Sequence, residues 1–445
     1  MASSFERFTL IQLAASIPNS TAAGPFGSNL VSRDYVERGV PVIRGQNLSE
    51  RWVGGDFVYV SQEKAYRLRT NTAKPGDIVF TQRGTLGQVS LVPAEPYDTY
   101  VISQSQMKLT VDESKADPVY VYYAAKSHDF ISQIQDNAVA AGVPHINLGL
   151  LRAMTIPVPC LHEQRSIAST LSSLDDRIDN LRQTNATLEA IAQALFKSWF
   201  VDFDPVRAKA EGREPEGMDA ATAALFPSEF EDSELGEIPK GWQVEQIGKM
   251  VSCLGGATPS TKEESFWQEG IHHWATPKDL SVLQSPVLVD TDRRITDAGL
   301  SKISSGLLPA GTLLLSSRAP IGYLAIAAVP TAINQGFIAM PPGGDLSPPF
   351  LLCWCKENMD LIKQSANGST FMEISKKAFR PLPVCVPPSE LLATFESVAG
   401  TLITRITENE RHRSSLEEVR DTLLPRLISG KLRISEDGIG LKEEA

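Results

Sequence analysis

The chain has 445 residues, enough for two or three domains, and its 42% content of hydrophobic residues is ample for packed cores. It contains no apolar run near the roughly 20 residues that a membrane-spanning helix needs. Its first ten residues lack the apolar core of a signal peptide, so we expect a cytoplasmic protein. The five cysteines are odd in number and form no C-x-x-C pair, which is typical of reduced thiols.

The formal net charge of −11 is unevenly distributed along the chain. Residues 1–160 contain 14 basic and 14 acidic residues, and residues 241–387 contain 12 of each. The excess of acid lies in residues 161–240, which contain 8 basic and 16 acidic residues. Many nucleic-acid-binding proteins are basic overall, and this chain is not. Either of the two neutral segments can nevertheless carry a local basic face.

Residues 1–160 predict a globular unit of short strands and turns with one or two helices. Residues 39–48 predict a strand that runs into a polar turn, and residues 74–92 predict two strands joined by a polar tip. The apolar spacing of residues 117–136 predicts one helix. The prolines of residues 156–159 then predict an edge strand that ends the unit.

Residues 161–201 predict one long helix. Its apolar residues recur at alternating steps of three and four, the a/d pattern of a helix that pairs along a narrow seam. Asn185 is a polar seam residue of the kind that fixes register in such pairs. The apolar seam positions are Ile167, Leu171, Leu174, Ile178, Leu181, Leu188 and Leu195.

An offset of 228 residues leads to a second predicted helix, residues 388–432, with a similar seam. Arg413 takes the position that corresponds to Asn185. Two matched helices with unpaired seams predict an antiparallel coiled coil with each other. The apolar seam positions of the second helix include Leu402, Ile406, Leu416 and Leu423.

Residues 202–240, between the first helix and the second unit, predict an acidic linker that contains four prolines and is partly ordered against the helix end. Residues 241–387 predict a second globular unit that repeats the first. Residues 309–322 align with 74–87, which places Arg318 on Arg83. Residues 433–445 form a C-terminal tail. The chain therefore predicts an α+β fold with two tandem α/β domains, two long paired helices and pseudo-two-fold internal duplication.

The sequence carries no catalytic or metal-binding motif. His162 and Glu163 lack the second histidine of an H-E-x-x-H zinc site. The glycine-rich residues 255–259 are not followed by the Lys-Ser/Thr pair of a phosphate-binding loop, and no nucleophile elbow is present. We therefore predict a recognition protein with no catalytic residue and no metal site.

Polar residues recur at the ends of predicted strands in both units. Arg, Gln and Asn side chains pair donors and acceptors in the geometry that base edges present in the major groove of DNA. Recurrence at equivalent places in two duplicated units favours a DNA-binding function. The predicted DNA-binding residues are Arg44, Gln46, Asn47, Arg83 and Gln104 in the first unit, and Lys278, Asp279, Arg318, Asn334 and Gln335 in the second.

Several motifs resemble the specificity (S) subunit of a type I restriction-modification system. In the first unit these are GPFGS at 24–28 and GVPVIRGQNL at 39–48, and in the second GGATPSTK at 255–262 and WATPKDL at 274–280. The helix ends ALFKSWFVDFD at 194–204 and LLPRLISGKL at 423–432 are similar to the ends of that family's spacer helices. The resemblance covers nearly the whole chain, in order and in duplicate.

The resemblance implies that residues 1–160 and 241–387 are target-recognition domains, each of which reads one half of a split double-stranded DNA sequence. The paired helices would set the gap between the halves. Two methyltransferase subunits and motor-nuclease restriction subunits would be the partners, without a membrane. S-adenosylmethionine and ATP with Mg²⁺ would bind to those partners, so no cofactor is expected in this chain.

Two alternatives remain open. The chain could serve a fused nuclease-methyltransferase enzyme instead of a complex of separate subunits. It could also be a coiled-coil adaptor with two protein-binding heads. Specific DNA binding with a steep salt dependence would separate a DNA reader from an adaptor.

Overall fold

A computed structural model describes residues 5–138, 143–368, 372–434 and 441–443. It divides into two compact units: Met1–Asp176 with Leu416–Ala445, and Arg177–Ser415. Each unit contains one globular domain, which we call the N-domain (residues 5–160) and the C-domain (residues 241–387), and a part of both long helices. Within the described residues, no helix is both long and apolar enough to cross a bilayer.

The N-domain is built on two sheets. The antiparallel sheet has the order β2-β10-β7-β8, and the mixed sheet has the order β3-β5-β4-β9-β6, with β4 and β9 parallel. The first strand, β1 (Arg7–Thr9), pairs with the last, β11 (Thr155–Pro157), so the two ends of the domain meet. The other strands are β2 (Thr21–Ala23), β3 (Tyr35–Val36), β4 (Val40–Ile43), β5 (Val58–Val60), β6 (Thr72–Ala73), β7 (Ile78–Thr81), β8 (Val89–Leu91), β9 (Tyr100–Ile102) and β10 (Gln106–Leu109).

The single helix predicted for residues 117–136 is wrong, because the structure has two helices there. Asp117 caps the first by accepting hydrogen bonds from the backbone of Val119 and Tyr120, both at 3.0 Å. Ser127 caps the second by accepting from the backbone of Phe130. The helices of the domain are α1 (Leu10–Leu13), α2 (Gln62–Arg67), α3 (Pro118–Ala125), α4 (His128–Asn137) and α5 (Leu148–Ala153).

The C-domain repeats this plan. Its sheets have the orders β16-β19-β18-β21 and β17-β15-β20, with β15 and β20 parallel, and its first and last strands, β14 and β22, pair. The strands are β14 (Gln243–Gln246), β15 (His272–Ala275), β16 (Val287–Leu288), β17 (Arg293–Ile295), β18 (Leu313–Ser317), β19 (Ile321–Ala327), β20 (Thr331–Ile333), β21 (Phe337–Met340) and β22 (Pro383–Val386). The helices are α9 (Ile247–Met250), α10 (Pro277–Ser281), α11 (Asp297–Leu300), α12 (Pro348–Glu357), α13 (Met359–Gln364) and α14 (Lys376–Phe379).

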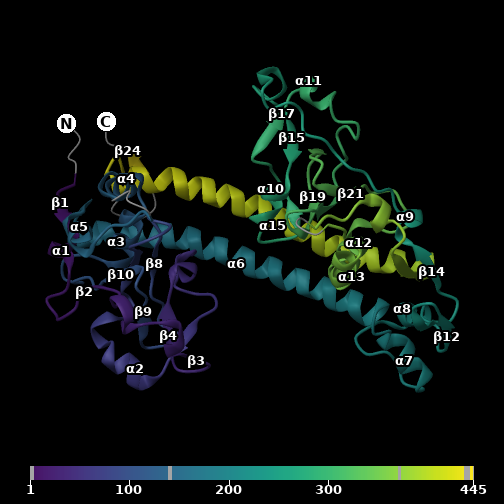
Figure 1. Ribbon diagram of the computed structural model, residues 1–445, viewed down its shortest axis with the longest axis horizontal. Helices are drawn as coiled ribbons and strands as arrows, with labels where there is room; N and C mark the ends of the chain where they lie inside the picture. Colours follow the sequence, from purple (N-terminus) through teal and green to yellow (C-terminus); the bar gives the residue numbers. More distant parts are fainter. Residues whose placement is uncertain (1–4, 139–142, 369–371, 435–440, 444–445) are drawn as a thin grey trace. The chain divides into compact units, whose positions relative to one another are not determined.

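The two long helices, α6 (Leu161–Phe200) and α15 (Ser389–Ile428), are unbroken over 40 residues each (Figure 1). In the unit Arg177–Ser415, Phe196 packs edge-on against Phe395 with ring centroids 6.0 Å apart, and Asn185 bonds to Asn409. Residue numbers thus rise along one helix as they fall along the other. The predicted antiparallel pairing is confirmed, and the predicted α+β fold with duplicated domains is confirmed with it.

Burial along the helices differs in detail from the predicted seam. Among the seam positions, Ile167, Leu171, Ile178, Leu181 and Ile406 are buried. Asp175 and Phe196 are buried, although the prediction places the adjacent residues Leu174 and Leu195 in the seam. The buried face is broader than a two-helix seam because each helix also packs on a domain. The seam positions that are only half-buried are Leu174, Leu188, Leu195, Leu402, Leu416 and Leu423.

A buried polar junction joins the helices at Asn185. The side-chain amide of Asn185 donates to Glu410 Oε1 at 2.7 Å, and Asn409 donates to Asn185 Oδ1 at 2.8 Å. Arg413, which corresponds to Asn185 in the duplication, pairs with Glu410 at 2.8 Å. The three residues Asn185, Asn409 and Glu410 are at most 3% exposed, so any shift of register would leave buried polar groups without partners.

The helix ends lie in the hydrophobic cores of the domains. In the first unit, Ile167 and Leu171 of α6 and Leu427 of α15 belong to the same buried cluster as Tyr120 of α3. In the second unit, Phe196 and Phe395 share a cluster with Phe350 of α12, and the rings of Phe196 and Phe350 are 5.0 Å apart. Each domain is therefore packed directly against the helix pair.

The acidic segment 202–240 is folded. It contains α7 (Asp204–Ala210), α8 (Ala220–Ala224) and a hairpin of β12 (Phe230–Ser233) and β13 (Gly236–Pro239). Phe203, Val206, Phe226 and Ile238 are buried in the same core as Trp242. The burial of these four apolar side chains explains why a segment rich in acid and proline is ordered. In the tail, β23 (Leu432–Ile434) pairs with β24 (Leu441–Glu443).

We predict that Asn185→Leu lowers the free energy of unfolding by about 1–3 kcal/mol, because Asn409 Nδ2 and Glu410 Oε1 then lose the buried hydrogen bonds that they make with Asn185. Gln183→Leu is the matched control, since Gln183 is exposed on the same helix. Thermal unfolding of both variants measures the difference. Equal melting temperatures would show that the junction contributes nothing to stability.

Candidate nucleic-acid interface

Parallel pairing in the N-domain brings separate polar segments to one edge. The backbone of Ser103 donates to Ile43 O at 2.9 Å, so the segments that follow β4 and β9 leave the sheet side by side. The backbone of Gln82 donates to Ser105 O at 2.7 Å, which adds the turn after β7. We call this edge, formed by residues 44–47, 82–84 and 103–105, the N-tip. It contains all five residues predicted in this domain.

The C-domain builds the same edge with equivalent bonds. The backbone of Asn334 donates to Ala275 O at 3.0 Å, and Ser317 donates to Gly336 O at 2.8 Å. We call residues 276–279, 317–319 and 334–336 the C-tip. It contains the other five predicted residues. Three segments that are separate in sequence thus meet in both domains through the same sheet geometry.

Asn47 and Asp279 have a structural role in the two tips. Asn47 is 2% exposed; its Oδ1 accepts from the backbone of Arg44 at 2.9 Å, and its Nδ2 donates to Gly54 O and Asp56 O. Asp279 is 8% exposed and accepts from Thr276 and from the backbone of Asp292. Their polar atoms hold the loops, so neither side chain is presented to a ligand.

Gln104 and Gln335 also occupy equivalent positions, and each holds a glycine-containing segment. The Gln104 amide donates to Gly27 O and, at 3.1 Å, to Leu30 O. Gln335 Oε1 accepts from Thr258 Oγ1 at 2.6 Å. The glycines are required by close packing: a Cβ on Gly24 or Gly256 would lie 1.8 Å from a backbone oxygen of the adjacent strand end.

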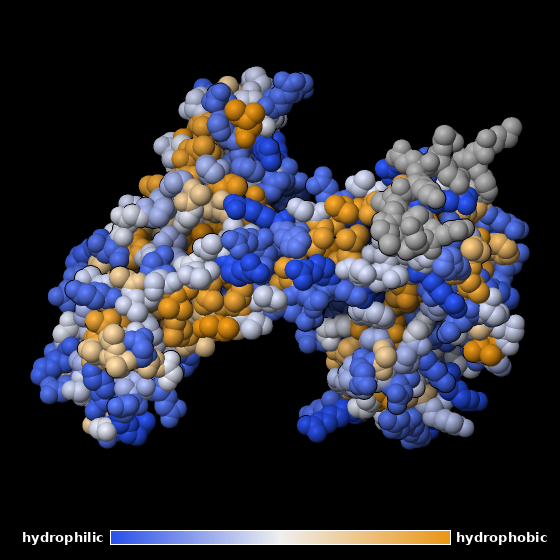
Figure 2. Space-filling view, turned by 180° about the vertical axis from the view of Figure 1, so that it is seen from behind, coloured by the Kyte–Doolittle hydropathy of each residue, from blue (hydrophilic) through white to orange (hydrophobic). Residues whose placement is uncertain are grey.

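The other predicted residues differ in how freely they are presented. Arg83 is exposed, and within the described part of the chain its guanidinium has no hydrogen bond or ion pair. Gln46 is exposed and donates a hydrogen bond to Asp56 O. Lys278 is exposed and forms an ion pair with Asp292. Arg318 lies 3.9 Å from Glu373 and is half-buried. Figure 2 shows the N-domain at the right, with hydrophilic residues interspersed with smaller hydrophobic patches.

The remaining two predicted residues are half-buried. Arg44 makes one long side-chain contact, 3.4 Å from Asp56 O. Asn334 accepts a hydrogen bond from the backbone of Gly336 at 2.8 Å, which shapes the turn at the C-tip. Sequence reasoning missed Asp56 and Asp292, which support the tips through backbone groups. No side-chain pattern could have indicated them.

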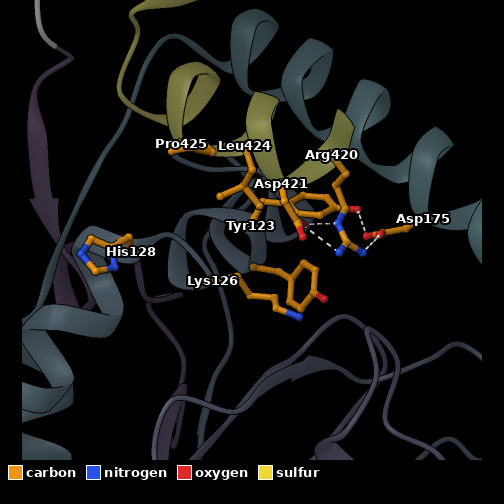
Figure 3. Close-up of a pocket in the computed structure, with 9 residues that line it drawn as sticks. Tyr123, Lys126, His128, Asp175, Arg420, Asp421, Leu424 and Pro425 are labelled. Carbon is orange, nitrogen blue, oxygen red and sulfur yellow. Dashed lines mark hydrogen bonds and ion pairs between the residues drawn. The ribbon is translucent and has the colours of Figure 1, made fainter. Parts of the chain in front are cut away.

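A second polar cluster, shown in Figure 3, lies in the first unit where both long helices meet α3. Asp175 accepts from the hydroxyl of Tyr123 at 2.6 Å and from Arg420 at 2.8 Å, beside a cavity of about 250 Å³. Burial, with the Asp175 charge and hydrogen bond, raises the pKa of Tyr123, so the hydroxyl stays a donor. Burial alone would lower the pKa of Arg420, but Asp421 and Asp175 outweigh it and raise that pKa. The cluster ties the N-domain to the helix ends.

Comparison with known proteins identifies this architecture. The model of the "Type I restriction modification DNA specificity domain" family matches residues 33–190 and 239–391, which together are well over half of the chain. The chain belongs to this type I specificity family. Each matched copy contains one tip and reaches into one long helix, the first copy into α6 and the second into the first residues of α15. Within the described residues, no group of three His, Cys, Asp or Glu side chains is arranged to hold a metal ion.

Relatives match over most of their length. The specificity subunit of the type I restriction enzyme HindI from Haemophilus influenzae is 26% identical over 404 residues, covering 81% of this chain and 87% of the relative. The MjaIX specificity subunit of Methanocaldococcus jannaschii is 24% identical, covering 91% and 89%. A crystal structure of a type I S subunit from M. genitalium has the same fold, with a TM-score of 0.54, 19% identity and coverage of 95% and 96%.

We predict that Asn47→Ala and Asp279→Ala each lower the free energy of unfolding by about 1–3 kcal/mol, because each leaves buried backbone groups without a partner. The exposed neighbours Gln46 and Lys278 supply the matched controls Gln46→Ala and Lys278→Ala, which should change stability by less than about 0.5 kcal/mol. Thermal or urea unfolding measures all four. Losses of equal size would contradict the assignment of Asn47 and Asp279 as loop supports.

Proposed function

We propose that this specificity-family chain is the DNA-reading subunit of a type I restriction-modification complex. Each domain reads one half of a split DNA site through its tip, and the helix pair separates the two readers. The observation that carries the proposal is the duplicated tip: the same strand pairing, the same loop supports and the same turn recur in both domains. A bipartite target needs two such readers on one chain.

The tips suit recognition of base edges. Arg83, with its exposed guanidinium, and Gln46 present donors that match guanine or adenine edges in the major groove. The N-domain has as many basic as acidic residues, so non-specific attraction to phosphate is weak and local contacts decide affinity. The excess of acid in residues 161–240 discourages DNA from lying along the helix pair.

We further propose that the subunit does no chemistry itself. Two methyltransferase subunits dock on the duplicated scaffold and bind S-adenosylmethionine, and restriction subunits that use ATP and Mg²⁺ complete the complex. The internal duplication supports two methyltransferases, because equivalent surfaces occur twice. A fused nuclease-methyltransferase partner uses the same scaffold, and the genes beside this one distinguish the two arrangements.

Exchange of one domain tests the division of labour. Replacing residues 1–160 with those of a relative should change one half of the methylated sequence and leave the other half unchanged, because each domain has its own core and tip. Sequencing that detects methylated adenine in the host genome measures both halves. A change in both halves, or in neither, would refute the split reader; absence of specific DNA binding by the complete complex would favour a protein adaptor.

Matched insertions test whether the helix pair sets the gap. We insert one heptad after Leu181 in α6 and another after His412 in α15. Both insertions lie on the N-domain side of the Asn185–Asn409 contact, so this contact is preserved. A heptad adds about 10.5 Å at 1.5 Å per residue, while nearly restoring the pairing face. That length corresponds to about three base pairs of B-DNA. We expect the recognised gap to grow by about one to three base pairs with both half-sites unchanged.

The control for this experiment is insertion in one helix alone, which leaves its seam without a partner and should lower the melting temperature. Methylation mapping of the doubly inserted variant gives the gap directly. The original gap in a stable, active variant would show that the helices serve as a scaffold for partner subunits and do not measure DNA.

A further inference from the structure

The C-domain carries a stacked cation, Arg293, beside its tip, and the equivalent strand position of the N-domain is Val58. The guanidinium of Arg293 lies over the ring of Trp267, 3.5 Å from its centroid, and 5.6 Å from that of Trp274. The two indoles pack edge to face with centroids 4.9 Å apart. The close contact with Trp267, and the second indole beside it, restrict the orientation of the planar group.

Arg293 is exposed, and its guanidinium has no acceptor among the residues that the structure describes. The next residue, Arg294, points to the opposite face of β17 and pairs with Asp290 at 3.3 Å. An oriented guanidinium with free N–H edges is suited to bidentate donation, which guanine O6 and N7 accept in the major groove. Preorientation lowers the entropy lost on binding.

Two connections place Arg293 at the C-tip. On one side, the backbone of the preceding residue, Asp292, donates to Asp279 at 2.8 Å. On the other side, the indole N–H groups of Trp267 and Trp274 donate to Ser260 O and Ala257 O. These carbonyls belong to the glycine-containing segment whose Thr258 donates to Gln335. Arg293 therefore lies between Asp279 of the C-tip and the segment 257–260, which Gln335 of the C-tip holds.

The N-domain has a valine at the equivalent place. Trp274 pairs with Ala332 and opposes Arg293, and in the N-domain Val42 pairs with Val101 and opposes Val58. The tips share their loop supports, but the stacked arginine of the C-domain corresponds to a valine position in the N-domain. The N-domain arginine that lies over an indole, Arg51 over Trp52, differs because its guanidinium pairs with Asp176. The backbone and the loop supports are shared, so the position of Arg293 and Val58 is one at which the two domains can read different bases.

We propose that Arg293 is a specificity-determining residue that reads a guanine in the half-site bound by the C-domain, and that Trp267 positions it. The inference rests on the proposed function and adds a residue and a base to it. It concerns one half-site only, because Val58 cannot donate a hydrogen bond from its side chain.

The test uses the complete complex with its methyltransferase subunits and S-adenosylmethionine. The substrates are duplexes that carry the site mapped for the wild type and every single-base change in each half. For Arg293→Lys and Arg293→Ala, discrimination should fall roughly 5- to 150-fold at one G·C pair of the C-domain half-site and nowhere in the other half. Trp267→Leu should relax the same base pair, whereas Arg294→Lys and Arg294→Ala should leave every ratio unchanged.

Other outcomes overturn the proposal. A uniform loss over all sequences, with a salt slope reduced by about one, would assign Arg293 to a phosphate. A lower melting temperature together with an equal loss of methylation on all sequences would show that the stack of Arg293 on Trp267 has a structural role only. Unchanged ratios in active Arg293 variants would remove it from recognition. A wild-type complex that methylates no split site would refute the proposed function itself, a result distinct from each of these.

Discussion

The burial of helix ends in the domain cores is the constraint on which the rest of the structure depends. Phe196 and Phe395 come from opposite ends of their helices, yet both lie in the C-domain core with Phe350. Ile167 and Leu427 do the same in the N-domain core. Each fully buried side chain of this size contributes about 1.5–3 kcal/mol. A domain cannot turn against its helix end without exposing these groups.

Polar junctions along the helices add specificity to this apolar packing. Asn185, Asn409 and Glu410 satisfy one another only in one register, and Asp175 binds Tyr123 and Arg420 only when α3 and both helices are in place. Buried polar groups of this kind contribute little net stability but make misaligned pairings costly. A protein proposed to measure the distance between two DNA sites needs a fixed register more than it needs extra stability.

The tips show how duplication can support two specificities. The loop supports, Asn47 and Asp279, are buried and equivalent, and the braces Gln104 and Gln335 hold equivalent segments. These residues fix the backbone in both domains. The exposed positions beside them are free to differ, as Val58 and Arg293 do. Because the residues that hold the backbone differ from the exposed residues that we propose contact DNA, the recognised bases can change without loss of the fold.

The sequence by itself determined the duplication, the two long helices and their antiparallel pairing, because a heptad period and a repeated motif order are properties of the chain alone. It also located the ten tip residues, since strand ends and turns carry local signals. Only the tertiary structure decided which of them face outward. Asn47 and Asp279 are polar residues in turns, and their burial follows from backbone groups of Gly54, Asp56 and Asp292 that no side-chain pattern reveals. The partner of Asn185 likewise depended on helix rotation, which the domain cores set and the heptad period leaves open.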